Sequence, residues 1–175
     1  MHTYSHFVIG AVAGKMLFPN SVAAQIVLVT ASVLPDLVMV PQFLMDKVRH
    51  KQPLAEQSKG LLFAKSASHS IPLWFTIALL PALLPFLSTT PTQEQLWFQG
   101  VVLAFLIGWL LHLIIDCFTH NGKEYSDTET GCFWPSPIRP QILGMWEYRY
   151  GPGILQPKPL EAAIDAGLVL FYCLT

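Results

Sequence analysis

Five apolar stretches, separated by more polar segments, constrain what this chain can fold into more than any other feature. They cover residues 7–18, 22–40, 71–87, 96–118 and 160–174. A helix needs about 20 predominantly apolar residues to cross a bilayer. The second and fourth stretches are long enough to span, the third is borderline and is expected to kink at its prolines, and the first and fifth are short. We therefore predict an all-α, polytopic membrane helical bundle of about four to five helices, with residues 1–175 as a single domain.

The composition agrees with a membrane environment. Only 12% of the residues are charged and 53% are hydrophobic, whereas an ordinary soluble domain has about 25% charged residues. The 10 Lys and Arg residues are balanced by 11 Asp and Glu residues, which excludes a strongly basic nucleic-acid-binding protein. We expect membrane lipid, and no nucleic acid, as a partner; the sequence does not indicate the oligomeric state. A very apolar soluble helical protein is the alternative.

Two polar regions predict the orientation of the chain. Residues 46–65 are charged, and residues 119–159 form a long irregular segment rich in Gly, Pro and aromatic residues. All the Lys and Arg residues except Lys15 lie in these two regions, and the positive-inside rule places such regions in the cytoplasm. The N-terminus is then cytoplasmic as well. Lys15 lies near the outer end of the first stretch, where its side chain could snorkel to the membrane surface.

Ionisable residues inside apolar helices are costly and are functional by default. In the fourth stretch, His112 and Asp116 are four residues apart, so they share one face of a helix and can ligate one metal ion together. A simple structural hydrogen bond between them is the alternative. His120 follows one turn later, as an extra ligand or as a group that supports the ligands.

Other unusual polar residues lie at the same predicted end of the helices. His6 precedes the first stretch, Asp36 lies in the inner half of the second, and His69 opens the third. We predict a divalent metal site built from residues of four stretches: His6, Asp36, His69, His112, Asp116 and His120. Nitrogen and oxygen ligands without thiolate suit zinc first, with manganese and iron as alternatives. Glu161 and Asp165, at the start of the fifth stretch, are instead expected to be exposed at the membrane interface.

These residues also carry a resemblance to a known family. The sequence resembles the membrane-bound metal-dependent hydrolases of bacterial inner membranes, and is more distantly similar to zinc-dependent phospholipase C and single-strand nucleases. The matching segments are His6-Phe7-Val8-Ile9-Gly10, Leu34-Pro35-Asp36-Leu37, His69-Ser70, residues 112–122 (HLIIDCFTHNG) and Phe133-Trp134-Pro135. The chain departs from the family at Val38, where a second Asp is common, and in the lead-in to His69, at residues 65–68.

The resemblance implies hydrolysis of a phosphoester at the inner (cytoplasmic) membrane. In this interpretation His69, His112 and Asp116 hold zinc, and His6 and Asp36 complete the site. Asp36, if it is not a ligand, is the candidate general base. Arg139 or Arg149 could engage a phosphate. The location favours a small or lipid-linked phosphoester substrate.

Two other functions remain open from the residues alone. A metal-ion or proton transporter would line a path with intramembrane His and Asp residues. A non-catalytic membrane protein would use the metal only to staple its helices together.

Overall fold

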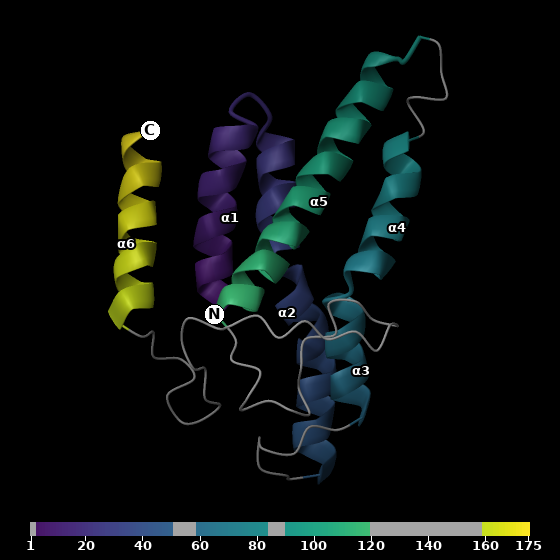
Figure 1. The fold of residues 1–175 in the computed structure, drawn as a ribbon, viewed down its shortest axis with the longest axis vertical. Helices are drawn as coiled ribbons and strands as arrows, with labels where there is room; N and C mark the ends of the chain where they lie inside the picture. The colour runs from purple at the N-terminus through teal and green to yellow at the C-terminus, as the bar shows by residue number, and fades with distance from the viewer. Residues whose placement is uncertain (1–2, 51–58, 84–89, 120–158) are drawn as a thin grey trace.

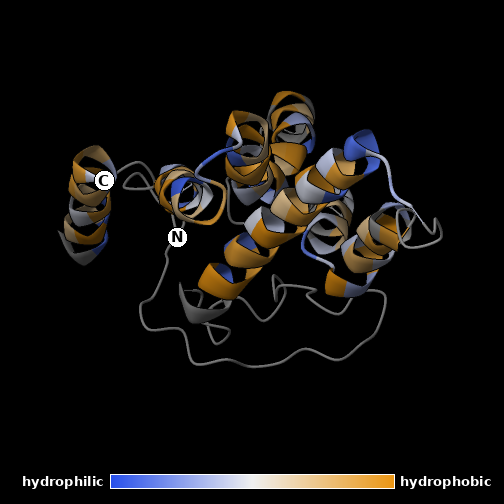
Figure 2. Ribbon diagram, turned by 90° about the horizontal axis from the view of Figure 1, so that it is seen from above, coloured by the Kyte–Doolittle hydropathy of each residue, from blue (hydrophilic) through white to orange (hydrophobic). Residues whose placement is uncertain are grey.

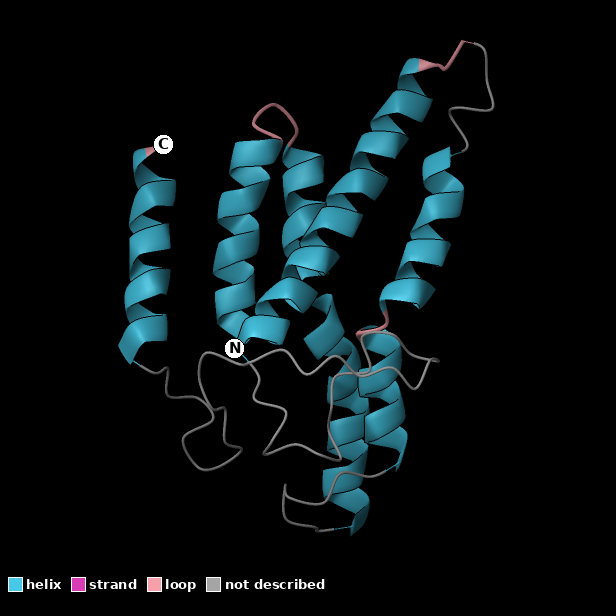
Figure 3. Ribbon diagram, in the orientation of Figure 1, coloured by secondary structure: helices cyan, strands magenta, loops and turns pink. Residues whose placement is uncertain are grey.

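The described part of the chain consists of α-helices. In the computed structural model, residues 3–50, 59–83, 90–119 and 159–175 are described, and these segments contain no strand (Figure 3). The helices are α1 (Thr3–Leu17), α2 (Val22–His50), α3 (Lys59–Ser68), α4 (Ile71–Leu83), α5 (Gln93–Thr119) and α6 (Pro159–Leu174). The all-α prediction is confirmed. The predicted irregular segment at 119–159 lies almost entirely outside the described residues.

The helices alternate in direction, and this brings distant segments to one level. α1 rises from the lower end of the bundle, α2 returns, α4 rises, α5 returns and α6 rises again (Figure 1). The start of α1, the middle of α2, the start of α4, the end of α5 and the start of α6 therefore lie at a similar height (Figure 1). α2 is the central element and packs against α1, α3 and α5, while α6 packs against α1.

The described residues form more helices than the apolar stretches alone predicted. α2 continues through the charged residues to His50, and α3 forms in the second half of the same polar region. α2 continues past Pro41, which directly follows its apolar stretch, and no Gly or Pro interrupts residues 42–50 beyond it. α3 packs on the extension of α2, and the two project past the lower ends of the other helices (Figure 1).

Among the helices that the structure describes, two are long and apolar enough to cross a membrane, and they are the two that the sequence predicted. These candidate spans are Val22–Gln42 and Gln93–Asp116. Only 28% and 39% of the residues in their most apolar windows are buried, so most of these residues keep part of their surface exposed, whereas the core helix of a soluble protein is mostly buried. Apolar residues surround the helices on their outward sides too (Figure 2). Ile26, Leu103 and Leu170 are examples of such exposed residues.

Small residues allow the central helices to approach closely. Gly10 of α1 packs against Ser32 of α2, and Gly108 of α5 packs against Leu28 and Ala31 of α2. Close approach of backbones at Gly, Ala and Ser is the usual way in which membrane helices associate. Below these contacts, Trp109 and Leu113 of α5 are fully buried against Ala31. This packing sets the separation of α2 and α5, on which the site depends.

Candidate metal centre

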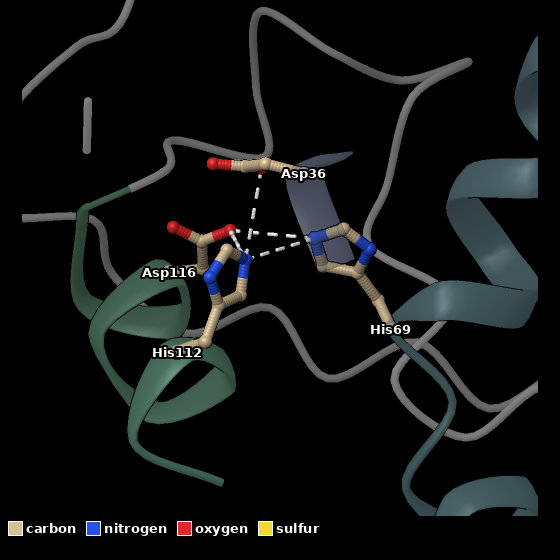
Figure 4. A group of neighbouring side chains, drawn as sticks. All are labelled: Asp36, His69, His112 and Asp116. Carbon is tan, nitrogen blue, oxygen red and sulfur yellow. Dashed lines mark hydrogen bonds and ion pairs between the residues drawn. The ribbon is translucent and has the colours of Figure 1, made fainter. Parts of the chain in front are cut away.

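Four side chains from three parts of the chain converge at the lower level of the bundle. Asp36 comes from α2, His69 from the junction between α3 and α4, and His112 and Asp116 from consecutive turns of α5 (Figure 4). One ligand atom from each lies within 4.8 Å of the others. His69, His112 and Asp116 are buried, and Asp36 is partly exposed. These four belong to the six ligands that the sequence predicted.

The spacing of the four ligand atoms fits a single metal ion. The Nε2 atom of His112 lies 3.3 Å from the Nε2 of His69 and 3.3 Å from Oδ2 of Asp116, and the latter two atoms are 3.5 Å apart. Oδ1 of Asp36 is 3.8 Å from Nε2 of His112. In a tetrahedral site with bonds of about 2.1 Å, neighbouring ligand atoms are separated by ~3.4 Å. The donor set and the three shortest of these distances are therefore compatible with a bound metal ion.

His112 is held in the tautomer that metal binding requires. Its Nδ1 lies 2.8 Å from the backbone carbonyl oxygen of Ser32 in α2. A carbonyl can only accept a hydrogen bond, so Nδ1 carries the proton and donates it. In the neutral ring, Nε2 then presents a lone pair to the other ligand atoms. This is the usual arrangement of a metal-binding histidine, whose second nitrogen donates to a backbone or carboxylate oxygen.

His69 is fixed by the way in which α3 ends and α4 begins. The indole nitrogens of Trp74 and Trp109 donate to the carbonyl oxygens of Ala67 and Ser68, at 3.0 and 3.1 Å, in the last turn of α3. The Ala67 carbonyl also accepts a hydrogen bond from the Ser70 amide. The hydroxyl oxygen of Ser70 accepts a hydrogen bond from the backbone amide of Leu73, at 3.2 Å, and so caps the N-terminus of α4.

The imidazole of His69 therefore projects from a rigid break between two helices. Its Nδ1 lies 2.9 Å from the Ser68 hydroxyl, which can accept a hydrogen bond from Nδ1–H, so that the lone pair of the neutral ring is on Nε2, the nitrogen that faces the cluster.

Asp36 stands at the accessible side of the cluster. About 20% of its side chain is exposed, against 6% or less for His112, His69 and Asp116. The hydroxyl of Thr3 donates to Oδ2 of Asp36 at 2.6 Å, so Oδ1 is the oxygen that faces the cluster. The site thus has three enclosed ligands and a fourth group that solvent can reach.

His6 lies beside the four-residue cluster and contacts one member of it. Its Nε2 is 3.1 Å from Oδ1 of Asp116, whereas the other oxygen of Asp116 faces His69 and His112. The His6 ring also stacks on that of His112, with ring centroids 3.9 Å apart. The structure therefore brings His6 to the site as a partner of Asp116, outside the group whose ligand atoms converge. His120, the remaining predicted ligand, lies outside the described residues, as do Arg139 and Arg149.

The prediction that Glu161 and Asp165 are exposed at the interface is wrong. Glu161 is 1% exposed and Asp165 is 7% exposed. Both accept hydrogen bonds from the hydroxyl of Ser5 in α1, at 2.9 and 2.6 Å. Their i, i+4 spacing put them on one face of α6, but only the packing of α6 on α1 turned that face inward.

Sequence analysis also missed the polar residues that orient the ligands. Thr3, Ser32 and Ser68 each bond directly to a member of the cluster. Ser68 could have been noticed as the direct neighbour of His69. Thr3 and Ser32 gave no local signal, because their partners lie 33 and 80 residues away in the chain.

Comparisons with known proteins give the family of the chain. A family model described as YdjM inner membrane protein matches residues 1–174. No curated protein and no solved structure gives a significant match. The description of the matched family agrees with the predicted membrane location and names no hydrolase activity or likeness to phospholipase C. On a match that covers nearly the whole chain, this protein belongs to the YdjM inner membrane protein family.

Proposed function

We propose that this protein is a membrane-bound, metal-dependent hydrolase that acts on a phosphoester at the cytoplasmic face of the inner membrane. The observation that supports the proposal most strongly is the convergence of two imidazole nitrogens and two carboxylate oxygens, all within 4.8 Å of one another. When bound, a divalent ion in such a site supplies Lewis acidity that activates water and polarises a phosphoryl oxygen. Zinc suits the donor set first, and manganese and iron are the alternatives.

The four side chains differ in exposure, and this difference suggests which of them bind the metal ion and which one acts as the general base. Catalytic zinc sites use three protein ligands and keep a fourth position open. His69, His112 and Asp116 are the enclosed set and would hold the ion. Asp36 is farther from His112 and is the group that solvent reaches, so it would accept a proton from the attacking water at Oδ1. The hydroxyl of Thr3 donates a hydrogen bond to Oδ2 of Asp36 and would thereby orient Oδ1 as the base.

The level of the site favours a substrate carried by the membrane. Asp116 is the last residue of one candidate span, and Asp36 lies within the last two turns of the other. The cluster would thus sit near the boundary between the apolar core and the headgroups, where a lipid or lipid-linked phosphoester presents its phosphate. The cytoplasmic side follows from the positive-inside rule, because the extension of α2 at this end carries Lys47 and Arg49.

The depth distribution of polar residues favours hydrolysis over transport. A transport path needs polar groups across the whole membrane thickness. Among the described residues, the buried polar side chains belong to the lower level of the bundle, at the starts of α1, α4 and α6, in the middle of α2 and at the end of α5 (Figure 1). The upper halves of α1, α2 and α5 bury Val12, Ala24, Leu28 and Ala104 instead.

Metal content tests the site. The protein, purified in mild detergent, is expected to hold about one divalent ion per chain, measured by plasma mass spectrometry. His112→Ala and Asp116→Ala should lose it, whereas Asp165→Asn, which alters a buried carboxyl group outside the cluster, should retain it. Unchanged metal content in both cluster variants would remove those residues from the site.

Turnover separates a hydrolase from a metal-stapled structural protein. A chromogenic phosphodiester and a phospholipid in mixed micelles are offered with and without chelator. We expect chelator-sensitive hydrolysis, faster on the lipid, and a loss of at least 100-fold in Asp36→Asn with metal retained, since general-base catalysis contributes about 10²–10⁴-fold. Metal-dependent stability without turnover on either substrate would favour the structural alternative. Loss of metal in Asp36→Asn would make Asp36 a ligand.

A further inference from the structure

A hydrogen bond between helices reaches the backbone of α2 at an unusual place. The carbonyl oxygen of Ser32 accepts the Nδ1 proton of His112 at 2.8 Å, and both residues are almost fully buried. In a regular helix the carbonyl of Ser32 faces along the helix axis, toward the amide of Asp36. A side chain from a neighbouring helix reaches such a carbonyl more readily where the turn around it is opened.

Pro35 is placed to open that turn. It lies inside α2, three residues after Ser32, and is fully buried. Proline has no amide proton, so the carbonyl of Ala31 loses its helical partner, and the proline ring crowds the preceding turn. The carbonyls of that turn then tilt away from the axis, and in membrane helices neighbouring helices take up the groups that proline frees. His112 is such a neighbour.

The hydroxyl group of Ser32 makes different contacts from those of the Ser32 carbonyl. Its single proton is shared between the carbonyl oxygens of Val29 and His6, which lie 2.7 and 2.9 Å from the hydroxyl oxygen, and this contact links α1 to α2. The contact to His112 uses the backbone oxygen of Ser32 and does not involve its side chain. The orientation of His112 therefore depends on the conformation of the helix, which Pro35 sets, and not on the hydroxyl group of residue 32.

We propose that Pro35 is a positioning residue for the metal site: it opens the Ala31–Ser32 turn of α2 so that the Ser32 carbonyl fixes the Nδ1–H tautomer of His112 and aims its Nε2 at the other ligands. This inference rests on the proposed metal site for its purpose, but the tautomer itself is a property of the metal-free protein. It gives the buried proline in the middle of a candidate span a role at the site.

Two prolines in one helix provide a matched test. Pro35→Ala restores an amide at position 35, and Pro41→Ala does the same at an exposed position farther along α2. Metal affinity is measured by competition with a chromophoric chelator, using Zn²⁺ and Co²⁺. We expect Pro35→Ala to weaken affinity 10- to 100-fold, the usual effect of losing a partner that orients a ligand. Pro41→Ala should stay within about threefold of the wild type.

Pro35→Ala is expected to weaken metal binding even though the substitution favours the helical conformation of α2. Alanine is a far better helix former than proline, so Pro35→Ala should keep or raise the helical content seen by circular dichroism. Equal affinity in Pro35→Ala and the wild type would overturn the proposal, and so would equal losses in Pro35→Ala and Pro41→Ala.

A second measurement needs neither metal nor a variant of α2. Imidazole ¹⁵N shifts of the metal-free wild type, assigned by comparison with His112→Gln, report which nitrogen of His112 carries the proton. The Nδ1–H tautomer is expected, and the Nε2–H tautomer would overturn the proposal. If the wild type bound no metal, the proposed function would fail, while this tautomer would still test the hydrogen bond from His112 to the Ser32 carbonyl on which the inference rests.

Discussion

Adding a single methyl group at Gly108 tests whether close contact of α2 and α5 builds the site. An ideal Cβ atom at Gly108 would overlap the carbonyl oxygen of Leu28 and would press on the side chain of Ala31. The carbonyl belongs to the backbone of α2 and cannot rotate away. Gly108→Ala therefore forces the two helices apart, and these helices carry Asp36, His112 and Asp116.

Gly100 provides the control in the same helix. An added Cβ there meets no atom within 4 Å. Both substitutions gain the same intrinsic helix propensity, about 1 kcal/mol for alanine over glycine. This gain cancels when the two variants are compared with each other. The difference that remains is the cost of overpacking, which is about 1–3 kcal/mol.

Unfolding in detergent micelles measures this difference. Far-UV circular dichroism is followed during denaturant titration, and Gly100→Ala is expected to be about as stable as the wild type or more stable. Gly108→Ala is expected to be less stable than Gly100→Ala by about 1–3 kcal/mol, with weakened metal binding. Equal stability of the two variants would refute the close contact of α2 and α5 on which the site geometry depends.

Three smaller perturbations address individual contacts. Thr3→Val removes the donor to Asp36 at 2.6 Å, and we expect at least a tenfold slower phosphoester hydrolysis with metal content unchanged; an unchanged rate would dismiss the aiming role. Trp109→Phe removes the indole N–H that donates to the Ser68 carbonyl, and the free energy of unfolding should fall by about 1–3 kcal/mol. Equal denaturation midpoints of this variant and the wild type would contradict that expectation. Lys15→Met removes the hydrogen bond from the Lys15 ammonium to the Tyr172 carbonyl in the last turn of α6, at 2.8 Å, which should be worth about 0.3–1 kcal/mol. The backbone amides of α6 should then exchange hydrogen faster, and unchanged exchange would count against this contact.

Much of the fold could be predicted because it depends on local properties of the chain. The length of an apolar run decides whether a helix can span, and the two longest runs became the two candidate spans. The boundary of α2 could not be predicted in this way, since residues 41–50 mix charged and apolar side chains and contain no helix breaker after Pro41. Helix formation there is favoured by packing on α3, which is a tertiary contact.

The same distinction between local properties and tertiary contacts applies to the candidate site. The four-residue spacing of His112 and Asp116 predicted a shared face, because helical periodicity is a property of one segment. Alternating helix directions also predicted that Asp36 and His69 lie at the same end.

Sequence alone therefore determined the chemical types of the ligands and their level in the bundle. Only the tertiary structure decided which ligand atoms meet, that His6 bonds to Asp116 beside the cluster, and that Glu161 and Asp165 face inward. The physical reason is that distances between helices come from how their small residues interlock, as Gly10 does with Ser32 and Gly108 with Leu28, and no single segment contains that information.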